Sequence, residues 1–301
     1  MGYTRTLSDI VEFYLNQTNM NLSASEQLAY STVRIECEYE DGVKGTGTGF
    51  FFRFLEDPEK DRHVPVVITN KHVVKDPEHG DAKKGRIIVS TANEDNSPND
   101  KDHFQVYYDN FRDSWRFHPD EDVDLCAMPM APFLEGAISK GKKLFYIALE
   151  HKLIPSASQL DELSGLEEIL MVGYPNGIWD SVNNKPIYRK GVTATHPNFD
   201  YNGKKEFLID AACFPGSSGS PVFIFNEGGY RDKKGTTYMG ASRILLLGIL
   251  YAGPQHTASG EIRIIDVPVA QKPIVLSTIP NNLGLIIKAE RIKELESEFK
   301  E

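Results

Sequence analysis

The sequence predicts an all-β protein. From about residue 31, short runs of β-branched and aromatic residues recur along the chain, and Gly, Pro, Asn and Asp separate them. Such a pattern favours a β-sandwich or β-barrel over a parallel α/β sheet. With 301 residues, the chain can form one large domain or two small ones with a substantial core. The strand-like runs of the first half cover residues 32–39, 48–52, 64–69, 86–90, 103–108 and 123–128.

A change of composition separates two β units. Residues 132–166 are richer in Leu, Glu, Lys and Ser, which indicates a connector with some helix. Strand-like runs resume at residues 168–174 and continue through residues 244–251. Between them, the polar segment 226–235 is predicted to be a turn or loop.

Short amphipathic helices are expected at both ends of the chain. Residues 6–9 could form a capping box before the first helix, and a strand at residues 283–287 leads into the second. The apolar faces consist of Leu7, Ile10, Val11, Tyr14 and Leu15 in the first helix and of Ile292, Leu295 and Phe299 in the second. We therefore divide the chain into an N-terminal helical extension (1–30), a first β-barrel (31–135), a connector (136–166) and a second β-barrel with the C-terminal helix (167–301).

Composition and charge argue against several classes of partner. Hydrophobic residues make up 40% of the chain and charged residues 25%, which is ordinary for a soluble globular protein. The net charge of −10 disfavours binding to a nucleic-acid backbone. No apolar stretch approaches the roughly 20 residues of a membrane helix, and residues 1–10 lack the features of a secretory signal. We therefore expect neither nucleic acid nor a membrane as a partner.

The three cysteines, Cys37, Cys126 and Cys213, are dispersed and lie in strand-like runs. Their odd number and their setting indicate reduced, buried thiols in a cytoplasmic protein. Their spacing matches no metal site. The alternating glycines of residues 45–49 are not a phosphate-binding loop, because no Gly-Lys-Ser/Thr follows them. We therefore expect no metal and no other cofactor.

A glycine-rich turn at residues 216–221, Gly-Ser-Ser-Gly-Ser-Pro, carries most of the information about function. Apolar runs at residues 207–209 and 222–225 flank it. Glycine on both sides of a serine lets the backbone fold tightly, so that N–H groups can bind the oxygen anion that forms when the serine attacks a peptide bond. We predict Ser218 as the nucleophile and the N–H groups of Gly216 and Ser218 as the oxyanion donors. A hairpin turn without chemistry is the alternative.

Two polar residues upstream could complete a catalytic triad. His72 follows an apolar strand and could shuttle a proton near neutral pH, although seven other histidines compete with it. Asp124 precedes the apolar run 125–128, and an acid at the edge of a buried strand is stabilised when an imidazole N–H binds it. Asp122 is the alternative, because it would face the same side of a strand. The order His, Asp, Ser predicts a triad of His72, Asp124 and Ser218.

Three segments together resemble the chymotrypsin-type serine endopeptidases, in particular the bacterial trypsin-like branch with the HtrA proteases and the glutamyl endopeptidases. Residues 69–74 are similar to the family's histidine segment, residues 123–127 to its aspartate strand, and residues 210–221 to its nucleophile segment. The resemblance covers about residues 31–296. It implies two perpendicular six-stranded antiparallel β-barrels with the triad in the cleft between them.

Departures from the family pattern limit what the resemblance implies. Ser217 replaces the aspartate with which animal digestive enzymes bind a freed N-terminus, so activation by that route is not expected. No PDZ-like domain fits after residue 300, and residues 132–166 match no segment of the family.

The predicted function is a serine endopeptidase that forms an acyl-enzyme and hydrolyses a restricted set of protein or peptide substrates. The resemblance places Ala212 at the base of the primary specificity pocket and Leu250 and Ala252 on its wall. Because these residues carry no charge, we expect a small or medium apolar residue before the cleaved bond. The alternative is a catalytically silent or partner-gated trypsin-like module, which would bind a regulatory protein or act in a cytosolic stress or defence pathway.

Overall fold

The computed structural model describes most of the chain. The predicted N-terminal helix over residues 7–15 lies outside the described residues. The first described helix is α2 (Ala24–Ala29), which begins with a capping box between Ser23 and Glu26. The described residues are 5–6, 22–57, 59, 62–253, 255–261, 274–280 and 282–300.

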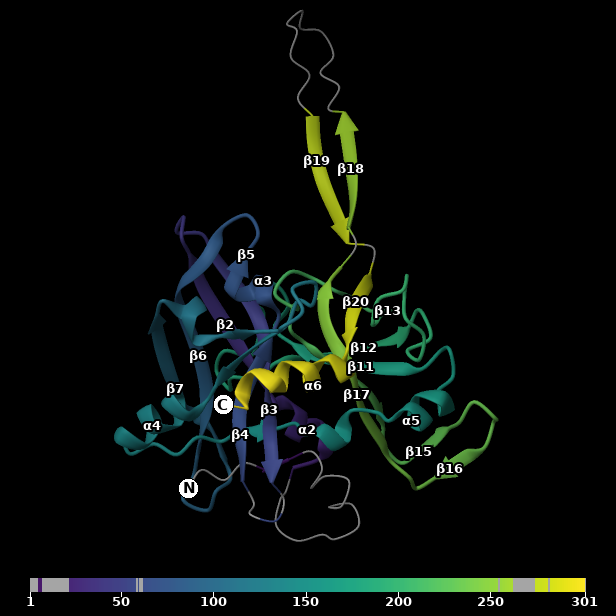
Figure 1. The fold of residues 1–301 in the computed structure, drawn as a ribbon, viewed down its shortest axis with the longest axis horizontal. Coiled ribbons are helices and arrows are strands. Elements are labelled where there is room, and N and C mark those ends of the chain that lie inside the picture. The colour runs from purple at the N-terminus through teal and green to yellow at the C-terminus, as the bar shows by residue number, and fades with distance from the viewer. Residues whose placement is uncertain are drawn as a thin grey trace, which may run out of the picture.

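The first half of the chain forms an eight-stranded sheet (Figure 1). The strands lie in the order β5-β6-β2-β3-β4-β9-β8, with β7 beside β6, and every pairing is antiparallel. The strands are β2 (Thr32–Tyr39), β3 (Lys44–Asp57), β4 (Arg62–Thr69), β5 (Lys75–Asp76), β6 (Gly80–Ala92), β7 (Pro98–Asp109), β8 (Arg116–Phe117) and β9 (Cys126–Pro129).

The second half forms a closed six-stranded antiparallel barrel in the order β11-β12-β13-β20-β17-β14. Its strands are β11 (Glu168–Gly173), β12 (Ile187–Thr193), β13 (Glu206–Asp210), β14 (Pro221–Asn226), β17 (Arg243–Ala252) and β20 (Leu283–Lys288). Two hairpins are inserted in it, β15 (Gly229–Arg231) with β16 (Thr237–Met239) and β18 (Gln255–Glu261) with β19 (Ile274–Pro280).

Short elements connect and cover the two halves. A two-stranded parallel pair joins β1 (Arg5–Thr6) to β10 (Ile147–Ala148). The other α-helices are α3 (Lys71–Val74), α4 (Ala131–Ser139), α5 (Ala157–Glu162) and α6 (Ile292–Leu295). The 3-10 turns are at Phe111–Ser114, His151–Leu153, Pro175–Gly177, Ala289–Arg291 and Glu296–Phe299.

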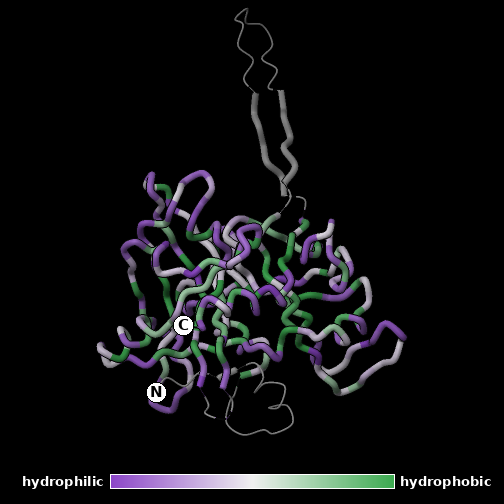
Figure 2. The backbone as a smooth tube through the Cα atoms, in the orientation of Figure 1, coloured by the Kyte–Doolittle hydropathy of each residue, from purple (hydrophilic) through white to green (hydrophobic). Residues whose placement is uncertain are grey.

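One apolar core runs from the first half into the second and under the C-terminal helix. Phe54 of β3 and Phe223 of β14 are fully buried in it, and the hydrophobic segments of both halves lie inside the molecule (Figure 2). The Phe54 and Phe299 rings meet edge to face with their centroids 5.1 Å apart. Ile292 and Leu295 are also fully buried, so the predicted apolar face of the C-terminal helix is confirmed.

The fold class predicted from the sequence is confirmed, with differences in detail. Six strands close the second barrel as expected, whereas the first sheet has eight because the two-residue strands β5 and β8 extend its ends. The strand expected at residues 123–128 begins only at Cys126, because a tight turn, closed by a hydrogen bond from Leu125 N to Val123 O, precedes it. The segment 226–235, predicted as a loop, contains β15.

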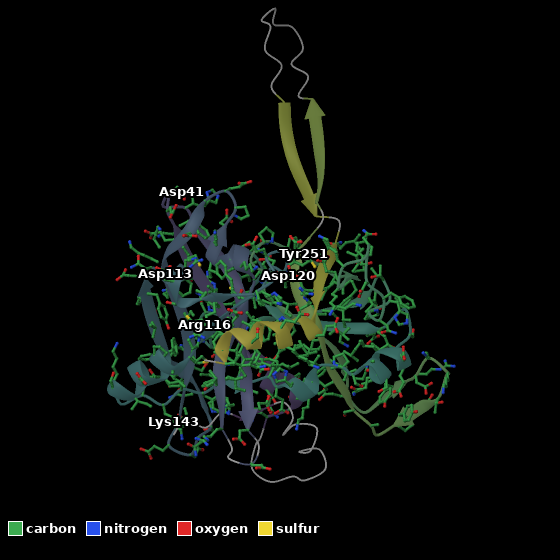
Figure 3. The ribbon with its side chains drawn as sticks, in the orientation of Figure 1. Asp41, Asp113, Arg116, Asp120, Lys143 and Tyr251 are labelled. Carbon is green, nitrogen blue, oxygen red and sulfur yellow. The ribbon has the colours of Figure 1, made fainter. Side chains whose placement is uncertain are left out.

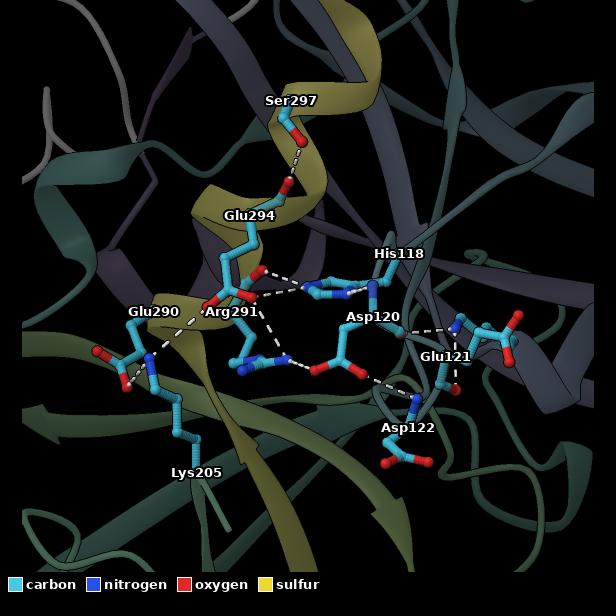
Figure 4. A network of polar contacts seen from close by, with 10 residues as sticks. His118, Asp120, Glu121, Asp122, Lys205, Glu290, Arg291, Glu294 and Ser297 are labelled. Atoms are coloured by element: carbon cyan, nitrogen blue, oxygen red, sulfur yellow. Dashed lines mark hydrogen bonds and ion pairs between the residues drawn. The ribbon is translucent and has the colours of Figure 1, made fainter.

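Polar and cation–π contacts tie the C-terminal helix to the first half. Arg116 is labelled in Figure 3. Its guanidinium lies over the Phe299 ring, 4.8 Å from the ring centroid. Arg291 Nη2 lies 2.6 Å from Asp120 Oδ2, and His118 Nε2 lies 3.5 Å from the Glu294 carboxylate (Figure 4). These contacts join segments more than 170 residues apart and hold the two halves against each other.

Candidate active site

His72 and Asp124 meet where two neighbouring strands of the first sheet end. Strand β4 ends at Thr69, and the short helix α3 that follows carries His72. Strand β9 pairs with β4 with Cys126 opposite Thr69, which brings Asp124, two residues earlier, beside α3. The positions of both side chains therefore follow from the register of one strand pair.

Both carboxylate oxygens of Asp124 bind His72. His72 Nδ1 lies 2.5 Å from Asp124 Oδ2, and the His72 backbone N–H donates to Oδ1 at 3.0 Å. Because the carboxylate accepts a hydrogen bond from Nδ1, it favours the tautomer in which Nε2 is free to accept a proton. About 30% of the His72 side chain is exposed, which leaves the ring accessible to a substrate.

Asn70 supports this pair, and the sequence analysis did not single it out. Its side chain is fully buried, and Nδ2 donates to the Asp124 carbonyl oxygen at 2.8 Å. Lys71 Nζ donates to the carbonyl oxygens of Asp120 and Glu121 in the same loop. The signal for Asn70 in the sequence is an amide side chain two residues before His72. Its partner, Asp124, lies 54 residues away, so the sequence does not reveal the contact.

The alternative acid, Asp122, lies elsewhere. Its side chain is exposed, and its backbone N–H donates to Asp120 Oδ1 at 3.0 Å. Among the described residues, the carboxylate in contact with His72 is that of Asp124. The structure therefore brings together His72 and Asp124 of the candidate residues in this half.

The glycine-rich turn packs against the first half of the molecule. A Cβ atom on Gly219 would lie 1.9 Å from the Thr48 carbonyl oxygen and 2.5 Å from Thr69 Oγ1, and Gly219 has a φ of +87°. Only glycine fits a left-handed residue at such a close approach. Thr48 N–H also donates to the Ser218 carbonyl oxygen at 2.8 Å. The turn with the partly exposed Ser218 thus lies against β3 and against the end of β4, three residues before His72.

Backbone carbonyls of this turn are bound, whereas two N–H groups are free. Asn176 N–H donates to the Pro215 carbonyl oxygen at 2.5 Å, and Thr48 Oγ1 donates to the Gly216 carbonyl oxygen at 3.0 Å. In a trans peptide the N–H points opposite to the C=O, so the Gly216 N–H points away from Asn176. Among the described residues, the N–H groups of Gly216 and Ser218 have no acceptor. They are available to an oxygen anion, as an oxyanion hole requires.

The residues assigned to the specificity pocket differ in exposure. Ala212 and Ala252 are partly exposed. Leu250 is only 3% exposed and packs in the core of the second barrel, while its backbone groups hydrogen-bond to Gly219 and Ser220. The pocket itself stays a prediction. The Arg189 guanidinium, which the sequence analysis missed, donates a hydrogen bond to the Ala212 carbonyl oxygen.

All three cysteines are buried and free. Burial raises the pKa of the Cys37 thiol to about 12 and that of the Cys213 thiol to about 11, so both remain protonated at neutral pH. In the described part of the chain, no group of three or more His, Cys, Asp or Glu side chains could hold a metal ion. The helices formed by the described residues are all too short or too polar to span a membrane.

A β-sheet unit and a closed β-barrel, with a His–Asp pair on one and a glycine-flanked serine turn of the other packed against it, are typical of chymotrypsin-like peptidases. The family model "Trypsin-like peptidase domain" matches residues 47–229, which is more than half of the chain. The chain therefore belongs to the trypsin-like peptidase family and is a serine-type peptidase. No curated protein matches the chain.

Several solved structures match the chain at low sequence identity. A thermostable serine protease, AL20, from an extremophilic microorganism is 11% identical with a TM-score of 0.46, and the match covers 90% of this chain and 98% of that one. The Rv3671c protease from M. tuberculosis is 15% identical with a TM-score of 0.42, covering 90% and 82%. The HtrA-type protease AlgW with a tripeptide is 14% identical with a TM-score of 0.42, covering 91% and 61%.

Proposed function

We propose that the chain is a serine endopeptidase with Ser218 as nucleophile, His72 as general base and acid, and Asp124 as the residue that orients His72. The observation that carries this proposal is the 2.5 Å contact between His72 Nδ1 and Asp124 Oδ2. Because Nδ1 faces the carboxylate, Nε2 is the ring atom that can take a proton from Ser218 Oγ.

The reaction follows from these roles. Ser218 Oγ bonds to the substrate carbonyl carbon while its proton moves to His72 Nε2, and the carbonyl oxygen becomes an anion that the N–H groups of Gly216 and Ser218 bind. The C–N bond then breaks, and His72 gives the proton to the leaving amine. Water attacks the acyl-enzyme with His72 as base, the ester bond breaks, and Ser218 Oγ recovers its proton.

The substrates of this reaction are proteins or peptides, and we propose a restricted set of them. The uncharged, partly exposed residues Ala212 and Ala252 support a preference for a small or medium apolar side chain before the cleaved bond, whereas the Leu250 side chain packs in the barrel core. A peptide library measures this preference, and cleavage dominated by Arg, Lys or Glu at that position would contradict it. The three buried, free cysteines support a cytoplasmic location.

Labelling of the purified protein with a fluorophosphonate probe tests the mechanism. The wild type is expected to react, and Ser218→Ala and His72→Ala are expected to lose both labelling and peptide turnover, the latter by about 10⁴- to 10⁶-fold. Ser217→Ala is the matched control, because Ser217 Oγ is buried without a hydrogen-bond partner among the described residues. This control is expected to label like the wild type.

A wild type that neither labels nor cleaves peptides would contradict the proposal. It would favour a catalytically silent or partner-gated module, for which the next measurement is labelling in the presence of the binding protein. Labelling that survives Ser218→Ala would show that another side chain is the nucleophile.

A further inference from the structure

Arg189 of β12 reaches the backbone that precedes the proposed nucleophile. Its Nη1 donates a hydrogen bond to the Ala212 carbonyl oxygen, and its guanidinium carbon lies 4.8 Å from the centroid of the Phe214 ring. Both contacts fall on residues 212–218, which we call the oxyanion segment. One side chain from a neighbouring strand thus binds the beginning of this segment through a polar and a cation–π contact.

The strand register explains how Arg189 reaches this position. Strand β12 pairs with β13 with Val192 opposite Asp210, and β13 ends at Asp210. A Cβ atom on Gly191 would lie 2.3 Å from the Asp210 carbonyl oxygen and 2.7 Å from Ala211 Cβ. The β12 backbone therefore continues directly beside the chain that enters the oxyanion segment, and Arg189 extends along it.

The charge of Arg189 has no carboxylate partner among the described residues. The side chain is partly buried, and this burial lowers the pKa of its guanidinium below the usual range. A partly desolvated cation is costly unless its donors are used. Here Nη1 donates to the oxyanion segment and the guanidinium lies over the Phe214 ring, while Ser217 of the same segment is uncharged and offers no carboxylate.

Among the described residues, the other hydrogen bonds of the oxyanion segment come from backbone groups and from Thr48, and the buried Cys213 side chain packs in the apolar core of the second barrel. Asn176 N–H binds the Pro215 carbonyl oxygen, and Thr48 binds the carbonyl oxygens of Gly216 and Ser218. Arg189 is therefore the charged side chain that binds the first residues of the segment. The peptide planes from Ala212 to Gly216 follow one another along the chain, so the direction of the Gly216 N–H depends on where these first residues are held.

We propose that Arg189 is a positioning residue that holds the oxyanion segment in the conformation that points the Gly216 N–H at the reacting carbonyl. This inference rests on the proposed function. The contacts of Arg189 are with the Ala212 carbonyl oxygen and the Phe214 ring, so we expect it to act through these two residues and not on the substrate. Its loss should weaken binding of the transition state more than binding of the substrate.

The test compares Arg189→Met and Arg189→Lys with Lys190→Met, which removes a charge from the next, exposed position of β12. Loss of one oxyanion donor costs about 10²- to 10³-fold in kcat, so a donor that is merely misdirected in Arg189→Met should lower kcat by about 10- to 100-fold. KM should change by less than about threefold. Arg189→Lys should recover part of kcat, and Lys190→Met should match the wild type.

The affinity for a peptide aldehyde inhibitor is a second measurement, and a purely structural role of Arg189 would not change it. The aldehyde's adduct with the nucleophile places an oxygen anion in the hole, so its affinity should fall in parallel with kcat/KM across the three variants. The melting temperature of each variant shows whether the protein is folded, and Arg189→Lys keeps the test valid if Arg189→Met does not fold.

Two results would overturn the inference while leaving the proposed function intact. One is an Arg189→Met enzyme with wild-type kcat and aldehyde affinity. The other is a change limited to substrates with an acidic residue before the cleaved bond, which would show that Arg189 faces the substrate side chain. A wild type without labelling or turnover would instead remove the proposed function, and this inference with it.

Discussion

Two His–Asp pairs lie seven residues apart in the first half of the molecule and have nearly the same local geometry. His72 Nδ1 lies 2.5 Å from an Asp124 oxygen, and His79 Nδ1 lies 2.7 Å from an Asp41 oxygen. Their surroundings differ. The two histidines are similarly exposed, but about 46% of the Asp41 side chain is exposed against 23% of the Asp124 side chain. In addition, the glycine-rich turn from the second barrel packs against Thr69, three residues before His72.

The carboxylates of the two pairs also have different partners. Asp124 binds the ring and the backbone N–H of His72, and the buried Asn70 amide holds its carbonyl oxygen. Asp41 binds His79 and the Val43 backbone N–H, and its hydrogen bond raises the pKa of His79. A His–Asp contact therefore does not by itself define a catalytic site. The pair at His72 differs because the glycine-rich turn packs beside it and because Asn70 binds the Asp124 carbonyl oxygen.

The largest expected effect that distinguishes the pairs is that of Asp124→Asn. In this variant the amide oxygen should keep the hydrogen bond from the His72 backbone N–H, so the amide NH2 faces Nδ1 and donates to it. The wrong tautomer of His72 then becomes populated, and kcat should fall by about 10⁴-fold. Peptide turnover measures the loss. Asp122→Asn, which changes an exposed carboxylate nearby, should keep kcat within about twofold of the wild type. Equal losses in the two variants would remove the role assigned to Asp124.

Gly219→Ala should lower peptide turnover, because it would separate the glycine-rich turn from the His72–Asp124 pair. The new Cβ atom would lie 1.9 Å from the Thr48 carbonyl oxygen at a φ of +87°, so the turn must move away from β3. We expect kcat to fall more than tenfold and the free energy of unfolding to fall by at least about 2 kcal/mol.

The matched control for that variant is Gly203→Ala. Gly203 has a φ of +78°, but no atom lies within 4 Å of its Cβ position. The control therefore carries backbone strain of about 1 kcal/mol without a collision, and activity should be unchanged. If Gly219→Ala behaved like this control, the close packing of the turn against β3 would not matter for catalysis.

A third histidine, His118, should influence stability and not chemistry. Burial is the main cause that lowers the pKa of His118 below its usual value, so the unfolded chain binds a proton at a higher pH than the folded chain does. The free energy of unfolding should therefore decrease as the pH falls below about 6.5, by up to about 1.4 kcal/mol per pH unit.

Chemical denaturation at pH 7 and at pH 5.5 measures this effect, and His118→Gln should reduce the slope. His79, whose pKa is raised by Asp41, has the opposite sign: its contribution is present below its unfolded pKa and is lost as the pH rises through its folded pKa. A slope that is the same with and without His118 would show that other groups cause the acid sensitivity.

The smallest effect is expected for Asp41→Asn. The Asp41 side chain is exposed, and its contacts are with His79 and the Val43 N–H and not with the turn at residues 216–221. Peptide turnover should therefore stay within about twofold of the wild type. The pKa of His79, followed by NMR, should move down towards its ordinary value, because the charged hydrogen-bond partner is lost. A large loss of turnover would show that the two pairs are coupled.

Much of the fold and part of the candidate site could be predicted from the sequence because the signals are local. Runs of β-branched and aromatic residues mark β2, β4 and β17 within one or two residues of their observed bounds or inside them. The glycines of the turn at residues 216–221 indicate tight backbone, and two of them do have positive φ. His72 and Asp124 stood out because a polar residue at the end of an apolar run needs a partner.

Other features depended on contacts between segments far apart in the chain. Thr48 binds a turn about 170 residues later, Asn70 binds the loop before β9, and Arg189 of β12 binds Ala212. The two-residue strands that make the first sheet eight-stranded have no periodicity of their own to read. The proposed cytoplasmic location and the limits of the connector at residues 136–166 stay predictions.

By itself the sequence determined the β class and the apolar face of the C-terminal helix, and it predicted the segments that would carry a nucleophile, a base and an acid. Only the tertiary structure decided that Asp124 and not Asp122 meets His72, that the turn rests on Thr48 and Thr69, and that Arg189 donates a hydrogen bond to the Ala212 carbonyl oxygen. The reason is physical. The alternation of apolar and polar residues and the chemistry of turns act over a few residues. The contacts named above depend instead on strand register and on how the sheet and the barrel pack, and many local sequences are compatible with each such arrangement.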